Sequence, residues 1–222
     1  SEVTASPREV VTAGILITAP GGDSRTYVIS ADLPPGWSYT AIPERITGGP
    51  AGSASAFVVI PVPADAAAGG YDVVLRASAE GSPSDSATVG ITIRVEGVLL
   101  FEVRATRRGA AGASSGDVIT QTYTVSNRGN TPSRVSVDIT SYPSWPVTTD
   151  PPDLQPLLEP GRDWTVDVMI TVPEQLDRSL THHVSVIVSP VDGAPGFAPV
   201  QTGVSTRVVP RKRQRLWNDN RP

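Results

Sequence analysis

The residue types that most often perform catalysis or bind metals are scarce in this chain of 222 residues. It has no cysteine and two histidines, His182 and His183, which are adjacent in a segment with a strand-like pattern. Neighbouring residues of a strand point to opposite faces, so this pair cannot aim both imidazoles at one metal ion or one nucleophile. We therefore expect two ordinary strand histidines, no catalytic residue and no metal site.

The 22 acidic residues show no recognisable cation-binding pattern. A calcium loop would need oxygen ligands at alternate positions, and no such Asp-x-Asp-x-Asp run occurs. Asp150 and Asp153 flank two prolines, where a Pro-rich turn explains the pattern better than a calcium site. No glycine-rich loop opens a helix, so a phosphate cradle is not supported and we expect no cofactor.

Tryptophans that could stack on sugar rings are the next candidates. Trp37, Trp145 and Trp164 lie in or beside segments with a strand pattern. Large aromatic side chains in small β-sandwiches usually pack against the core, and we expect that here. Trp217 lies in a basic C-terminal segment and is the one tryptophan expected to be exposed.

The last residues, 210–222, differ in composition from the rest of the chain and are expected to form a basic tail or a linker to a further domain. Their candidate contact residues are Arg211, Lys212, Arg213, Arg215 and Trp217. Clustered arginines with a tryptophan also suit an anionic surface such as lipid headgroups or acidic polysaccharide. The formal net charge of the whole chain is −4, so nucleic acid is not an expected partner.

The elements that position these residues are predicted to be strands. Twenty-two prolines leave little room for long helices, because an internal proline costs a helix about 3 kcal/mol. The clearest alternation runs over residues 163–172, where Trp164, Val166, Val168, Ile170 and Val172 share one face. No stretch approaches the roughly 20 apolar residues of a membrane-spanning helix. The pattern is typical of an all-β protein.

The chain also repeats itself. Val59-Ile60-Pro61-Val62-Pro63 recurs as Met169-Ile170-Thr171-Val172-Pro173, 110 residues later. Strand patterns surround both copies, which favours two tandem immunoglobulin-like β-sandwiches of about seven strands each. We place the first over residues 1–97 and the second over residues 98–209, followed by the basic tail.

The turn and core residues of both halves resemble the NEW3 type of bacterial immunoglobulin-like domain, which occurs beside carbohydrate-active enzymes and in cell-envelope proteins. The resemblance covers roughly residues 5–95 and 98–190 and rests on these motifs: Leu33-Pro34-Pro35-Gly36-Trp37, Val62-Pro63-Ala64 and Gly69-Gly70-Tyr71 in the first half, and Gly116-Asp117, Ser126-Asn127-Arg128-Gly129-Asn130, Trp145 and Val172-Pro173 in the second. In the first half only Ile15–Ala19 separates Gly14 from Pro20. We therefore expect its second strand to be several residues shorter than the matching strand of the second half.

The expected function is non-catalytic. The two domains would act as a spacer, adhesion or partner-docking module of an exported bacterial protein in the periplasm, at the cell surface or secreted. Expected partners are other domains of the same protein or envelope proteins, with polysaccharide as a further candidate. The resemblance also implies a second hypothesis, a carbohydrate-binding accessory of a glycoside-active enzyme. A periplasmic pilus chaperone, which also pairs two such sandwiches, is the third.

Overall fold

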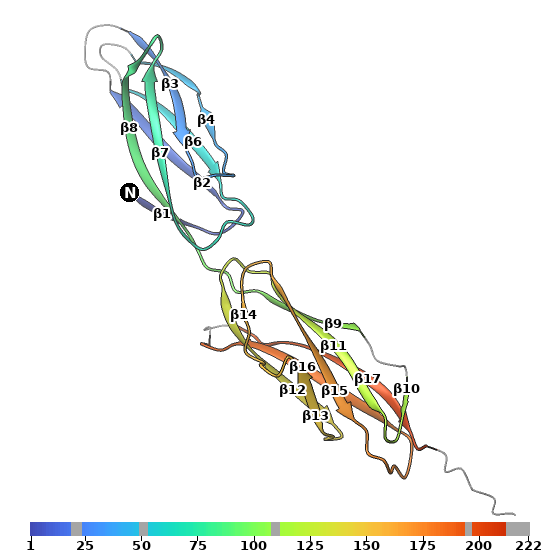
Figure 1. Ribbon diagram of the computed structural model, residues 1–222. Helices are drawn as coiled ribbons and strands as arrows, with labels where there is room; N and C mark the ends of the chain where they lie inside the picture. Colours follow the sequence, from blue (N-terminus) through green and yellow to red (C-terminus); the bar gives the residue numbers. More distant parts are fainter. Residues whose placement is uncertain (19–23, 49–52, 108–111, 194–196, 212–222) are drawn as a thin grey trace, which may run out of the picture. The chain divides into compact units, whose positions relative to one another are not determined.

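The computed structural model describes residues 1–18, 24–48, 53–107, 112–193 and 197–211. Within these residues the regular elements are all β-strands, which confirms the predicted all-β fold (Figure 1). The chain divides into two compact units, Ser1–Val98 and Leu99–Pro222. Each unit is a sandwich of two sheets and is described by itself.

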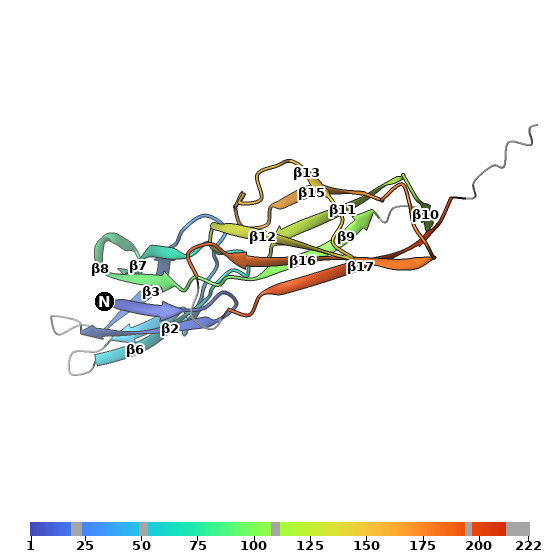
Figure 2. The same ribbon diagram turned by 90° about the horizontal axis from the view of Figure 1, so that it is seen from below.

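The first unit contains a five-stranded sheet of order β1-β8-β7-β3-β5 and a three-stranded sheet of order β2-β6-β4. Figure 2 shows β2 and β6 on one side of the unit and β3, β7 and β8 on the other. Neighbouring strands are antiparallel except β1, which runs parallel to β8. The strands are β1 (Glu2–Ala5), β2 (Val10–Thr18), β3 (Arg25–Asp32), β4 (Thr40–Ile42), β5 (Arg45–Gly48), β6 (Ser53–Pro61), β7 (Gly69–Ala79) and β8 (Ser82–Val95).

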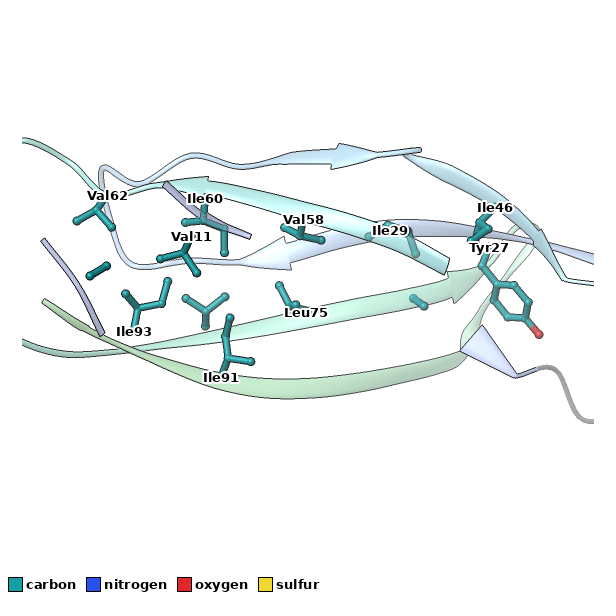
Figure 3. Packing of buried hydrophobic residues seen from close by; sticks show 14 of the residues in the cluster. Val11, Tyr27, Ile29, Ile46, Val58, Ile60, Val62, Leu75, Ile91 and Ile93 are labelled. Atoms are coloured by element: carbon teal, nitrogen blue, oxygen red, sulfur yellow. The ribbon is translucent and has the colours of Figure 1, made fainter. Parts of the chain in front are cut away.

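The core of the first unit lies between these sheets because the strands alternate apolar and polar residues. Val58 and Ile60 of β6 point inward from the three-stranded sheet, and Leu75 of β7 and Ile93 of β8 point inward from the other (Figure 3). All four are essentially inaccessible to solvent. Their burial at period two fixes the register of each strand, since a slip by one residue would turn the apolar set outward.

The second unit repeats this plan with one strand more. Its sheets have the orders β10-β17-β16-β12-β14 and β13-β15-β11-β9, and β10 runs parallel to β17. The strands are β9 (Phe101–Arg107), β10 (Gly112–Ser114), β11 (Val118–Asn127), β12 (Ser133–Tyr142), β13 (Val147–Asp150), β14 (Leu157–Leu158), β15 (Asp163–Thr171), β16 (Leu180–Pro190) and β17 (Val200–Val209).

The pairing patterns show which strands of the two units correspond. Strands β1 to β8 correspond in order to strands β10 to β17. Each strand pairs with the corresponding neighbours, in the same parallel or antiparallel direction. Val11 pairs with Ile60 in the first unit, and Ile119 pairs with Ile170 in the second. This leaves β9, an outer strand beside β11, without a counterpart among the described residues of the first unit.

The predicted shortening of the second strand is wrong. β2 spans nine residues and β11 spans ten, so the two matching strands are nearly equal. Gly14 does not begin the strand but lies in its middle opposite Phe57, and a Cβ built there would be 3.8 Å from the Phe57 ring. A glycine inside a strand often marks such a close side-chain approach and does not always mark a turn or the end of a strand.

The turn predicted from Asn127-Arg128-Gly129 is present and centres on a buried amide. Asn127 Oδ1 accepts a hydrogen bond from Gly129 N at 2.9 Å, while its Nδ2 donates to the carbonyls of Thr131 and Leu158, both at 2.9 Å. Asparagine suits this place because its side chain can mimic a backbone turn. One side chain thus joins the β11–β12 turn to β14.

Candidate functional site

The candidate site is the outer edge of β2, an open sheet edge in the described part of the first unit. One edge of β2 pairs with β6 over its whole length, and no strand of the described residues pairs with the other edge. In the second unit β9 covers the equivalent edge of β11. An edge that is open in the first unit is therefore covered in the second unit by a strand of that same unit.

The core-facing side chains of β2 are less buried than their counterparts in β11, because no described strand covers the edge of β2. The common register makes Ile15 the counterpart of Tyr123 and Ile17 the counterpart of Val125. Tyr123 and Val125 are fully buried beneath β9, opposite Ala105 and Val103. Ile15 and Ile17 also face their core but remain partly exposed.

The backbone of β2 has hydrogen-bonding groups directed to this open edge. Val62 N donates to the Glu9 carbonyl at 2.8 Å, and Val172 N donates to Asp117 at 2.9 Å at the matching place in the second unit. Antiparallel strands bond each neighbour through alternate residues. The odd-numbered residues of β2 therefore bond to β6, and the N–H and C=O groups of Leu16 and Thr18 face outward.

A groove of about 480 Å³ lies beside this edge. It separates β2 from the part of β8 that precedes the β1–β8 pairing, which covers only Thr92 to Val95 of β8. Core residues line it as well as edge residues: Ile15, Leu16, Ile17, Thr18, Tyr27, Leu75, Ala77, Asp85, Ser86, Ala87, Thr88 and Val89. The only charged residue of this set, Asp85, is held by Arg25 at 2.5 Å, and both side chains are about half exposed.

The outer face of the three-stranded sheet extends the apolar surface. Leu16 of β2, Phe57 of β6 and Ile42 of β4 are 69%, 52% and 55% exposed. Phe57 lies between Gly14 and Ile42 in the cross-strand register. The matching face of the second unit is polar, with Thr122 bonded to Asp167 at 2.5 Å. Contiguous exposed apolar side chains of this kind mark interaction surfaces more often than isolated ones do.

The histidines behave as predicted, on opposite faces of β16. His182 is 0% exposed, stacks on Trp145 with ring centroids 4.4 Å apart, and shares a 2.8 Å hydrogen bond between Nε2 and Ser141 Oγ. Burial lowers the pKa of His182 below its usual 6.5. His183 is exposed and its Nδ1 lies 3.1 Å from Ser205 Oγ. The two imidazoles share no site.

The tryptophans pack on the sandwiches and do not form an open platform. Trp37, Trp145 and Trp164 are each partly buried against the core of their unit. Trp37 packs on Tyr71 at 4.9 Å, in the position where Trp145 packs on His182. Each of these two indole rings is therefore in contact with a neighbouring ring.

The basic C-terminal residues are only partly covered by the structure. Arg211 is tied to the second unit, since its Nη2 lies 2.9 Å from Asp117 Oδ1 and its backbone N donates to Ser115 Oγ at 2.8 Å. Lys212, Arg213, Arg215 and Trp217 lie outside the described residues. Their contact with an anionic surface stays a prediction.

Two further kinds of site are absent from the part of the chain that the structure describes. No group of acidic and histidine side chains there is arranged to hold a metal ion. Asp153 Oδ1 instead accepts a hydrogen bond from Gln155 N at 2.9 Å, as in an ordinary turn. No helix that could span a membrane occurs among these residues.

Sequence reasoning did not find the open edge. The alternation of Leu99, Phe101 and Val103 predicts a strand before the second repeat, but it does not say which sheet edge that strand covers. Recognising this requires the pairing of β9 with β11, which alternation does not reveal.

Comparison with known proteins supports the fold. Residues 6–80 match the family described as the NPCBM-associated, NEW3 domain of alpha-galactosidase, which confirms the predicted resemblance for most of the first unit. No curated protein sequence matches the chain.

The chain also aligns with several solved structures at low identity and low TM-score. They include the Escherichia coli chaperone DraB (20% identity over 50% of this chain and 56% of that chain, TM-score 0.35). The titin domains Z1Z2 in complex with telethonin align over 95% of this chain and 92% of theirs (14%, TM-score 0.35). A protocadherin gammaB7 EC3–6 structure aligns over 95% of this chain and 45% of its own (12%, TM-score 0.43). The DraB alignment spans little more than half of that chaperone.

Proposed function

We propose that this chain is a non-catalytic interaction module of an exported bacterial protein and that it docks a partner protein through the open edge of β2. The observation that carries the proposal is the unpaired outer edge of β2, flanked by an apolar groove and an apolar sheet face. Native proteins usually protect such edges with charged residues, prolines or bulges. β2 reads Val-Val-Thr-Ala-Gly-Ile-Leu-Ile-Thr and contains no charge and no proline.

The expected partners are other domains of the same protein or neighbouring envelope proteins. The match of residues 6–80 to a domain associated with alpha-galactosidase supports an accessory role. It also supports export, because enzymes that act on polysaccharides meet their substrates outside the cell.

Site-specific photocrosslinking in producing cells tests the proposal. A benzoylphenylalanine at Phe57 places the probe on the exposed sheet face beside β2, and the same probe at Asp167 marks the matching position of the second unit. We expect a protein adduct of defined mass from position 57 and none from position 167. Equal adducts from both positions, or none from either, would contradict docking at this edge.

The second candidate function is carbohydrate binding, which the family description favours. Trp37 and Trp145 each keep some exposure beside their stacking partners. Titration with alpha-galactosides, followed by tryptophan fluorescence, distinguishes the two functions. A saturable change that Trp37→Ala abolishes would favour sugar binding, whereas our proposal predicts no such change.

A further inference from the structure

We propose that the groove beside β2 accepts a donor strand from another polypeptide, which pairs antiparallel to β2 and carries apolar side chains at alternate positions. The inference rests on the proposed docking function and specifies its ligand. The chain itself contains the template for this ligand, because β9 occupies the equivalent place in the second unit.

β9 shows how such a strand binds. It runs antiparallel to β11, with Val103 opposite Val125 and Ala105 opposite Tyr123. These two β9 side chains pack against the core, while the alternate residues Glu102 and Arg104 pair with each other on the solvent side. The donor therefore needs an extended segment with apolar residues two positions apart.

The correspondence of β2 with β11 sets the register of the donor. An apolar donor residue equivalent to Val103 would lie opposite Ile17, and one equivalent to Ala105 would lie opposite Ile15. Their side chains would enter the space lined by Tyr27, Leu75 and Ala77. The partly exposed core face of β2 would then become buried as that of β11 is.

The groove also specifies the size of the donor side chains. In the second unit the small Ala105 faces the large Tyr123, but in the first unit the facing residue is the smaller Ile15. Protein cores reach crystal-like density, so the smaller partner leaves room for a larger donor side chain. We infer a preference for valine, leucine or isoleucine at the donor position opposite Ile15.

Main-chain hydrogen bonds supply the rest of the recognition. Arg128 N donates to the Leu100 carbonyl at 2.7 Å, which places the even-numbered residues of β9 in hydrogen-bonding position toward β11. Arg104 pairs with Thr124, the counterpart of Leu16. In strand addition such main-chain bonds give affinity and the pockets for alternate side chains give specificity.

The direct test measures binding of a synthetic peptide with the sequence of residues 99–107 to the full chain by calorimetry. Two matched peptides accompany it, one with alanine 105 replaced by valine (A105V) and one of the same composition with the alternation shuffled. We expect the first to bind, the valine peptide to bind more tightly and the shuffled peptide not to bind. Equal binding of all three, or binding of none, overturns the inference.

Backbone methylation tests the pairing geometry without altering the protein. An N-methyl group at Arg104 removes a donor that faces β2, whereas one at Val103 faces away from it. We expect the first peptide to lose roughly fivefold or more in affinity and the second to lose much less, since each lost hydrogen bond costs about 1 kcal/mol or more. Equal losses would overturn the strand geometry.

A protein variant provides the complementary test. Leu16→Pro removes an N–H that faces the open edge, and edge strands tolerate proline at such positions. Leu16→Thr is the control, because it keeps the N–H and reproduces the Thr124 of the second unit. We expect Leu16→Pro to abolish peptide binding and Leu16→Thr to retain it, with circular dichroism confirming that both variants fold. If Leu16→Pro does not fold, the methylated peptides decide.

The outcomes separate this inference from the proposed function. If the peptides fail to bind but the adduct from position 57 persists, partner docking stands and donor-strand binding is refuted. If the adduct is also absent, the docking function itself fails. Concentration-dependent self-association in sedimentation, blocked by Leu16→Pro but not displaced by the peptide, would show that a second copy is the occupant and would also overturn the inference.

Discussion

The contribution of a covering strand can be measured in the second unit, where β9 is already in place. Phe101 is the most buried residue of β9, at 3% exposure, and its ring packs edge-on against Phe197 with centroids 5.6 Å apart. Phe101→Ala should destabilise this unit by about 3 kcal/mol. Buried Phe→Ala changes cost about 3–5 kcal/mol, and a strand at the rim of a sandwich can partly close over the cavity. For a unit of this size the loss corresponds to about 12 °C in Tm.

The assay is urea unfolding of the full chain, followed by hydrogen exchange and mass spectrometry so that each unit is read separately. Leu100→Ala is the matched control, because the neighbouring Leu100 is 52% exposed. The control should change the free energy of unfolding by about 0.5 kcal/mol or less. The first unit should be unaffected by either change.

The amides of β11 provide a second measurement in the same experiment. If β9 protects the edge of β11, Phe101→Ala should accelerate exchange in both strands more than elsewhere in the second unit. A loss below about 1 kcal/mol, or uniform exchange throughout the unit, would refute the reasoning that this strand is an integral cover. The analogy between β9 and a donor strand would then lose its physical basis.

Three further predictions concern the second unit. Asn127→Ala should lower the free energy of unfolding by about 2–3 kcal/mol, because three hydrogen bonds of a buried amide are lost; urea denaturation checks this. Tyr123→Phe should cost about 1–2 kcal/mol in the same assay, since it leaves the buried Gln121 Oε1 without the hydroxyl that now donates to it at 2.7 Å. The stability of the unit should also fall as pH decreases below 6.5, because the unfolded chain binds a proton that buried His182 resists, its folded-state pKa being lowered. The fall should not exceed about 1.4 kcal/mol per pH unit and should be absent in His182→Gln, whereas a pH-independent difference between the two proteins would contradict it.

Much of the fold was predictable from local patterns. Alternation in residues 163–172 identified β15 and its buried face, and the Val-Pro repeat identified two copies of one plan. Adjacent histidines could be assigned to opposite faces because strand geometry requires it. These features depend on residues close together in sequence, which is why the sequence sufficed.

Gly14 illustrates where local reasoning failed. Its place before the short apolar run Ile15–Ala19 suggests that a strand begins there, yet it lies within β2 beside the ring of Phe57. Glycine permits both a turn and a close approach, and only the position of a residue more than 40 places away in sequence distinguishes them. The full length of β2, and hence of its open edge, followed from that pairing.

The amino-acid sequence by itself determined that this is an all-β protein of two repeated sandwiches, since hydrophobic period and turn residues are local properties. It also excluded thiol chemistry, because no cysteine is present. Only the tertiary structure decided which strand edges are covered. That depends on which strands become neighbours, and β2 and β11 differ in this respect although their own patterns are alike. The candidate site is the edge of β2 that no described strand covers, whereas β9 covers the matching edge of β11. It can therefore be recognised only from the pairing of the strands.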